Sequence, residues 1–125
     1  MATLDTSELL KNIEIFSGLD ERQRSALSDL CEWISVRAGE QIYLVGEDRH
    51  DLYIVLSGQV RLVKDSTAGK SIVLDTLSEG AHFGENLLFS EEPTQFSAYS
   101  TTDVTLLQLS KDRLDTYRQQ RPEID

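Results

Sequence analysis

The middle of the chain consists of short β-rich runs separated by turn residues at regular spacing. Ala38-Gly39-Glu40, Gly46-Glu47-Asp48 and Ser57-Gly58 are turn signals of this kind, because glycine permits the backbone to reverse direction. Many short strands at such spacing indicate a β-sandwich or jelly-roll barrel rather than alternating βα units. The predicted strands are Ile34 to Arg37, Gln41 to Val45, Leu52 to Leu56, Gln59 to Lys64, Ser71 to Leu74, Gln95 to Ser100 and Val104 to Leu109.

Two helices are predicted ahead of the strands. Thr6 or Ser7 can cap the first of them. Asp20 is a good N-cap for the second, and Gln23 occupies the capping-box position. Apolar residues then recur at the spacing of one buried helix face, which predicts a helix that ends near Trp33. This face consists of Leu27, Leu30, Cys31 and Ile34.

A last helix is predicted after the strands, because Ser110 is a suitable cap and Pro122 marks an end. The 125 residues suffice for one domain with its own core. We therefore predict a single, mainly β domain over residues 1–125, with a jelly-roll-like β-roll of about eight strands and flanking helices. Its parts are N-terminal helices over 1–33, the β-roll over 34–109 and the C-terminal helix over 110–121.

The net charge of -10 excludes several classes of function. A nucleic-acid-binding surface needs a basic stripe, and anionic lipid also repels an acidic chain. No apolar run is long enough to span a bilayer and no signal peptide is visible, so a cytoplasmic location without membrane binding is expected. Cys31 is the only cysteine, which excludes an internal disulfide and favours a buried structural thiol.

The residues needed for common enzyme chemistries do not occur together. His50 and His82 are the only histidines and form no His-x-His pair, which disfavours a metal site. No Gly-x-Ser-x-Gly nucleophile elbow is present. A solvated acidic surface accounts for the many carboxylates. We expect no enzyme, no metal and no cofactor.

The candidate ligand site is the stretch of residues 80–89, which includes Phe83-Gly84-Glu85. The residues after Gly84 can form one helical turn, and a glycine before a helix N-terminus presents free backbone N–H groups that can seat a phosphate. Glu85 can accept hydrogen bonds from sugar hydroxyls, as acidic residues do on a ribose in dinucleotide sites. Taken alone, these three residues also fit an ordinary turn with a surface acid.

The order of elements, together with these motifs, resembles the cyclic nucleotide-binding domain family, which includes regulatory domains of kinases, ion channels and the catabolite activator protein. Residues 38–42 look like the family's first glycine turn, and residues 45–48 and 51–60 are similar to its core strands. Phe83-Gly84-Glu85 falls where the family places its phosphate-binding cassette. The resemblance covers nearly the whole chain.

The resemblance implies that a cyclic nucleotide such as cAMP or cGMP lies inside the roll. Gly84 would let the backbone approach the nucleotide, and Glu85 would hold the ribose 2′-hydroxyl. The N–H groups of Asn86 and Leu87 would meet the cyclic phosphate. The candidates for apolar walls, which can equally serve only the core, are Val63, Ile72 and Leu74.

The chain departs from the family pattern within the cassette. The family carries an arginine next to the proline, where this chain has Thr94, or Gln95 if the loop is one residue longer. Glu91 and Glu92, the nearest charges, have the opposite sign. An arginine–phosphate bond contributes roughly 1.5–3 kcal/mol, and leaving a buried charge unpaired costs about 3–5 kcal/mol. Binding would therefore weaken by roughly two to three orders of magnitude.

Three basic side chains are candidates for compensation. They are Arg61, Lys64 and Lys70. Alternation along the strand places Arg61 on the face opposite to Val60 and Leu62, which favours solvent if those two residues are core. Compensation and plain surface charge both stay open for the three.

Two functions remain open. The first is a non-enzymatic sensor domain of the cyclic nucleotide-binding type, with weak or altered binding because the cassette arginine is absent. The second is a degenerate domain that acts as a protein-interaction or dimerisation module, a homodimer included. In the family the chain continues beyond the last helix as the output element, whereas this sequence stops at Asp125. An effector domain or a partner protein is therefore expected.

Overall fold

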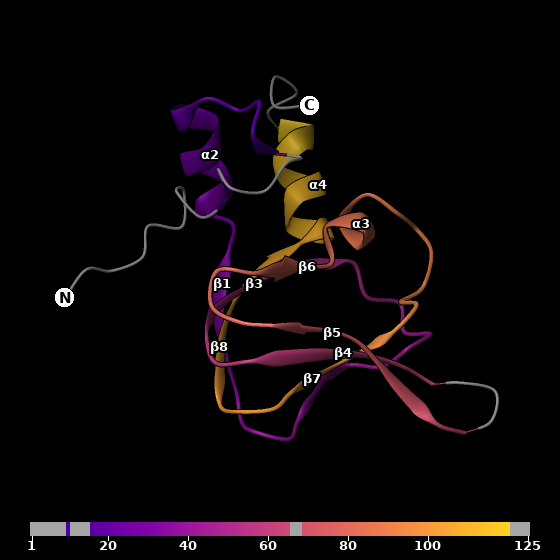
Figure 1. Ribbon diagram of the computed structural model, residues 1–125. Coiled ribbons are helices and arrows are strands. Elements are labelled where there is room, and N and C mark those ends of the chain that lie inside the picture. Colours follow the sequence, from indigo (N-terminus) through magenta and orange to yellow (C-terminus); the bar gives the residue numbers. More distant parts are fainter. Residues whose placement is uncertain (1–9, 11–15, 66–68, 121–125) are drawn as a thin grey trace.

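The computed structural model describes residue 10, residues 16–65 and residues 69–120. Its elements are α2 (Glu21–Ser28), β1 (Glu32–Val36), β2 (Gln41–Tyr43), β3 (Asp51–Ser57), β4 (Val60–Asp65), β5 (Ser71–Leu77), β6 (His82–Phe83), α3 (Glu85–Leu88), β7 (Ser97–Ser100), β8 (Val104–Ser110) and α4 (Lys111–Gln120). The strands form two four-stranded antiparallel sheets, ordered β1-β8-β3-β6 and β2-β7-β4-β5, with the helices gathered at one end (Figure 1). The predicted mainly β roll is thereby confirmed.

Strand β3 lies at the centre of the structure and is buried on both faces. Leu52, Ile54 and Leu56 belong to the cluster that includes the buried helix residues. Tyr53 and Val55 belong to a second cluster inside the roll. A strand covered on both sides must be apolar at consecutive positions, since neither face meets water. This explains the unbroken apolar run that the sequence shows here.

Helix α2 begins as the sequence predicts and ends earlier. The Asp20 carboxylate accepts a hydrogen bond from the Gln23 amide at 2.8 Å, and the Gln23 side chain accepts one from the Asp20 amide at 3.0 Å. The helix ends at Ser28, so the predicted end near Trp33 is wrong. The reason is that Ile34 lies in β1, which pairs along its length with β8. Ile34, the last residue of the helical pattern, therefore forms part of a strand instead.

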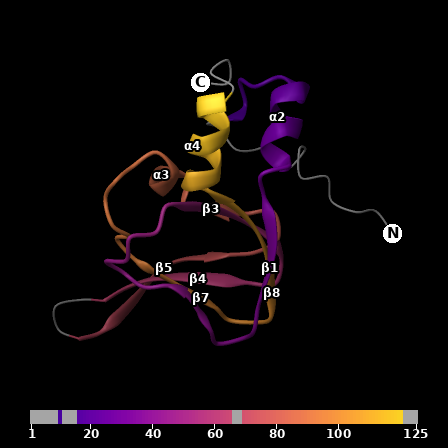
Figure 2. The same ribbon diagram turned by 180° about the vertical axis from the view of Figure 1, so that it is seen from behind.

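The other terminal helix predictions fall partly outside the described residues. The first helix, with its caps Thr6 and Ser7, lies outside them apart from Leu10, which is helical and fully buried. Helix α4 follows Ser110, whose hydroxyl oxygen accepts a hydrogen bond from the Arg113 amide at 3.2 Å. Helices α2 and α4 lie side by side above the roll, as the opposite view also shows (Figure 2).

Cys31 lies in the turn between α2 and β1 and is partly buried. Its thiol donates to the Leu27 carbonyl at 3.5 Å, and burial raises its pKa to about 12. A thiol with so high a pKa stays protonated at neutral pH and is a poor nucleophile. Cys31 therefore serves packing.

The connection from β6 to α3 requires glycine. Strand β6 pairs with β3, and its two residues are too few to give a sequence signal of their own. Gly84 then turns the chain into α3 with φ of 89°, in the left-handed region. A Cβ atom at this position would collide with the backbone oxygen of Asp51 in β3. The turn is thus both conformationally strained for other residues and closely packed.

The close approach at Gly84 predicts a stability difference between two glycine variants. Gly80 has the same φ of 89° but open space around its Cβ direction. Gly80→Ala should therefore cost only the left-handed conformation, about 1 kcal/mol. Gly84→Ala should cost a further ~1–3 kcal/mol, because the backbone must move to admit the methyl group. Urea denaturation of the two variants and the parent checks this; equal losses would show that the packing at Gly84 is unimportant.

Candidate functional site

Aromatic side chains fill the interior of the roll next to β6. The Phe83 ring stacks on Tyr53 with a centroid distance of 5.0 Å, and Tyr43 lies 6.2–6.3 Å from three neighbouring rings. The hydroxyl of Tyr43 has no hydrogen-bond partner in the described part of the chain, and burial raises its pKa. It therefore stays protonated. The aromatic group forms a solid back wall for the space in front of it.

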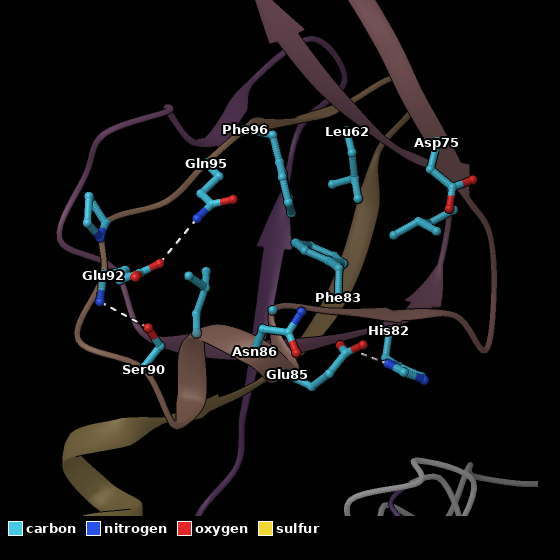
Figure 3. Close-up of a pocket in the computed structure, with 14 residues that line it drawn as sticks. Leu62, Asp75, His82, Phe83, Glu85, Asn86, Ser90, Glu92, Gln95 and Phe96 are labelled. Carbon is cyan, nitrogen blue, oxygen red and sulfur yellow. Dashed lines mark hydrogen bonds and ion pairs between the residues drawn. The ribbon is translucent and has the colours of Figure 1, made fainter.

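A pocket of about 470 Å³ opens in front of this wall, which is in the usual size range for small-molecule sites. We call residues 83–96, which supply most of its lining, the cassette. Strands β4, β5 and β6 complete the lining (Figure 3). The lining residues are Leu62, Asp75, Leu77, His82, Phe83, Gly84, Glu85, Asn86, Leu87, Ser90, Glu92, Pro93, Gln95 and Phe96.

Glu85 stands in the pocket at the start of α3. Its carboxylate lies 3.1 Å from the Nδ1 atom of His82, and each side chain is about one third exposed. The contact fixes one carboxylate oxygen, Oε2, and leaves the other oxygen able to accept hydrogen bonds from a bound molecule. The turn at Gly84 thus places a hydrogen-bond acceptor in the pocket, and the ribose-binding role predicted for Glu85 stays a prediction.

The backbone of α3 offers fewer donors than the sequence analysis expected. The Leu87 amide donates to the Gly84 carbonyl at 2.9 Å, so it is engaged within the turn. The amides of Glu85 and Asn86 belong to the first helical turn and have no intrahelical acceptor. Asn86 is exposed at the rim, whereas Leu87 packs against the interior cluster.

Gln95 and Thr94 point in different directions, which separates the two positions considered for the missing arginine. Gln95 lines the pocket, and its amide donates to the Glu92 carboxylate at 3.3 Å (Figure 3). Thr94 is buried and does not line the pocket. Its hydroxyl donates to the Leu44 carbonyl at 2.6 Å and accepts from the Glu47 amide at 3.0 Å. Thr94 therefore anchors the cassette to the β2–β3 loop.

The apolar part of the lining differs from the predicted walls. Val63 does not line the pocket, and Ile72 and Leu74 on β5 are 51% and 50% exposed and lie outside it as well. The β4–β5 ladder shifts register between Leu62 and Val63, which changes the faces of the β5 residues beyond that point. Strict alternation from the sequence cannot anticipate such a shift. The apolar lining consists instead of Leu62, Leu77, Phe83, Leu87, Pro93 and Phe96.

The charged groups of the lining are mostly acidic. They are the carboxylates of Asp75, Glu85 and Glu92, and none of the described lining residues is a lysine or an arginine. Arg61 is exposed between buried Val60 and Leu62, as the alternation predicted. Lys64 and Lys70, the other candidates for compensation, are also exposed and outside the lining.

One direct contact and one route through His50 connect the cassette to the start of α4. The Lys111 ammonium donates to the Ser90 carbonyl at 3.3 Å, and its backbone amide donates to the His50 carbonyl at 3.0 Å. The His50 ring lies 3.1 Å from the Leu87 carbonyl oxygen. A displacement of the cassette would therefore act directly on the first residue of α4. These contacts could not be predicted from the sequence, because no local pattern relates residues so far apart in the chain.

Two features are absent from the part of the chain that the structure describes. No helix in this part of the chain has the length and apolar character needed to cross a membrane. No group of three or more His, Cys, Asp or Glu side chains in the same residues could hold a metal ion.

Comparison with known proteins identifies the architecture. Residues 33–121 match the family described as "Cyclic nucleotide-binding domain". A CRP-like cAMP-activated global transcriptional regulator of Mycobacterium tuberculosis is 28% identical over 94% of this chain. The chain spans about half of that relative's length, 52%.

Two solved structures extend the comparison. The N-terminal domain of a transcriptional regulator from Streptomyces coelicolor has a TM-score of 0.83 and 27% identity, covering 93% of this chain and 81% of that one. The regulatory subunit of a cAMP-independent protein kinase A from Trypanosoma cruzi, bound to guanosine, has a TM-score of 0.76 and 25% identity, covering 87% and 38%. With the family match over most of its length, the chain belongs to the cyclic nucleotide-binding domain family.

Proposed function

We propose that the chain is a non-enzymatic sensor domain that binds a nucleotide-like molecule in the pocket over the cassette. The observation that carries the proposal is the placement of Glu85. It stands in a pocket of about 470 Å³, directly after the turn at Gly84 and beside the aromatic wall. A carboxylate so placed can accept hydrogen bonds from ribose hydroxyls. The apolar walls can hold a base, since aromatic faces stack on bases.

The binding of ordinary cyclic nucleotides is weakened in this proposal. Gln95 lines the pocket next to Glu92, near the place where the family resemblance implies an arginine. An amide beside a carboxylate cannot balance a phosphate charge, which needs a cation for a strong bond. The structural neighbour from Trypanosoma cruzi, which is cAMP-independent and bound to guanosine, supports an altered ligand within this fold.

The signal would pass through the cassette to α4 and from there to an effector domain or a partner protein in the cytoplasm. Lys111 and His50 supply the contacts for this coupling. The matched relatives that are transcriptional regulators and kinase regulatory subunits support a regulatory role. The buried Thr94, with its hydrogen bonds to the β2–β3 loop, would serve as the fixed end of the cassette during this movement.

Calorimetric titration with cAMP and cGMP tests the proposed pocket. We expect weak binding, with dissociation constants in the millimolar range, because the family site loses roughly two to three orders of magnitude without its arginine. Gln95→Arg should strengthen binding by about tenfold or more, since it adds a charge-assisted bond. Thr94→Arg is the matched comparison: its side chain would start from a buried position outside the pocket and should destabilise the domain instead.

Glu85→Gln provides the second arm of the same test. This substitution keeps the size of the side chain and removes the negative charge that strengthens hydrogen bonds from the ribose hydroxyls. The residual binding of nucleotides should therefore weaken. Sub-millimolar binding of cAMP by the unmodified chain would contradict the weakened site. Absence of a response to every nucleotide and nucleoside tested would contradict the sensor function itself.

An interaction or dimerisation module remains the second candidate, favoured by the surface of β5. This strand is at the edge of its sheet, and three consecutive apolar residues on it are about half exposed. An exposed apolar edge strand is a template for pairing with another strand. The three residues are Ile72, Val73 and Leu74.

Sedimentation analysis tests this second candidate. If β5 pairs with β5 of a second copy, the chain should sediment as a dimer at micromolar concentration. Val73→Lys should then return it to a monomer, because a charge at an edge opposes strand pairing. Arg61→Glu, at an exposed position of the neighbouring strand β4, is the control and should leave the dimer intact. A monomer at all concentrations would remove the self-pairing form of this function.

A further inference from the structure

The charges of the side chains that line the pocket indicate which class of nucleotide-like molecule it favours. Three carboxylates, those of Asp75, Glu85 and Glu92, line a space in which none of the described lining residues is a lysine or an arginine. The one basic side chain of the lining, His82, already contacts Glu85. We propose that this site selects uncharged ribonucleosides over their cyclic phosphates, an inference that rests on the proposed function.

Arg49, Lys111 and Arg61 do not line the pocket and cannot balance a phosphate charge from their present positions. The Arg49 guanidinium donates to the Tyr53 hydroxyl at 2.8 Å and lies 3.4 Å from the Asp51 carboxylate. The Lys111 ammonium donates to a backbone carbonyl. Arg61 is on the solvent face of β4. A phosphate entering the pocket would therefore meet negative side chains without a compensating positive one. Because Asp75 and Glu92 are exposed and Glu85 is about one third exposed, this repulsion acts partly through water and is screened by salt.

The three carboxylates lie on different sides of the pocket. Figure 3 shows Glu92 on one side of the pocket, Asp75 on the opposite side, and Glu85 on the cassette between them. Glu92 is held in place because its carboxylate accepts from Gln95 and its amide donates to the Ser90 hydroxyl oxygen. Negative charges thus lie on three sides of the space that a phosphate group would enter.

The same carboxylates suit a ribose whose hydroxyls are free. A nucleoside has 2′- and 3′-hydroxyls that can both donate to one carboxylate, whereas a 3′,5′-cyclic phosphate leaves only the 2′-hydroxyl free. Carboxylates accept such bonds strongly, and Glu85 is oriented by His82 for this role. Phe83, Phe96 and Leu62 offer apolar surface for the base. The lining therefore favours the uncharged molecule with the free diol.

Isothermal titration with adenosine, guanosine and their 3′,5′-cyclic phosphates tests this selectivity. We expect each nucleoside to bind at least about tenfold more tightly than its cyclic phosphate, because the carboxylates repel the added charge. 2′-Deoxyadenosine should bind more weakly than adenosine, since it lacks one half of the diol. Glu92→Gln and Asp75→Asn should each reduce the ratio of the two dissociation constants. Gln95→Arg should lower the ratio by about tenfold or more, because the guanidinium binds the cyclic phosphate and not the nucleoside.

Glu91→Gln is the matched control for the acid variants. Glu91 is exposed, adjoins Glu92 in sequence and does not line the pocket, so its variant should leave the ratio unchanged. Tighter binding of the cyclic phosphates by the unmodified chain would overturn the inference while leaving the proposed sensor function in place. Binding of neither class would overturn both. A ratio that responds equally to Glu91→Gln and Glu92→Gln would show that net charge, not the lining, decides.

Discussion

The close contact between Gly84 and the backbone of Asp51 is the constraint on which the site depends. It brings the chain after β6 against β3, so the cassette starts from a strand that is buried on both faces. The turn has a positive φ and admits no side chain. Glu85 follows at once and is thereby fixed relative to the aromatic wall. The geometry of the pocket is thus set by backbone packing more than by any polar contact.

The far end of the cassette is held by different means. Thr94 ties it to the β2–β3 loop through side-chain and backbone hydrogen bonds, while Ser90 and Leu87 contact Lys111 and His50. Thr94 is buried, whereas Ser90, Leu87 and His50 are only partly buried, so the contacts with His50 and Lys111 can open more easily than those of Thr94. Two anchored ends, at Gly84 and Thr94, and a middle part held by fewer buried contacts suit a segment that moves when its pocket fills. In the proposed function this movement is what reaches α4.

Much of the fold could be predicted from the sequence, because its signals are local. The capping box at Asp20 and the apolar run of β3 both specify their own structure. The end of α2 was mispredicted, since pairing of β1 with β8 overrides a helical pattern that continues past Ser28.

The site was less predictable than the fold. Gly84 and Glu85, which the resemblance implied, both line the pocket. Whether Thr94 or Gln95 faces the pocket depends on a single position in a loop, and the hydrogen bonds of Thr94 decide it. The apolar lining differs from the predicted walls because the β4–β5 ladder contains a register shift. Asp75 was not anticipated, since it comes from a strand whose facing changes at that shift.

The salt dependence of cyclic nucleotide binding tests most directly the claim that carboxylates without a balancing cation govern this pocket. Screening by salt weakens interactions between partly exposed charges, attractive and repulsive alike. The account predicts that the affinity for cAMP increases as ionic strength rises, whereas the affinity for adenosine stays nearly constant. An affinity for cAMP that falls with added salt would reveal a cation holding the phosphate and would contradict the account.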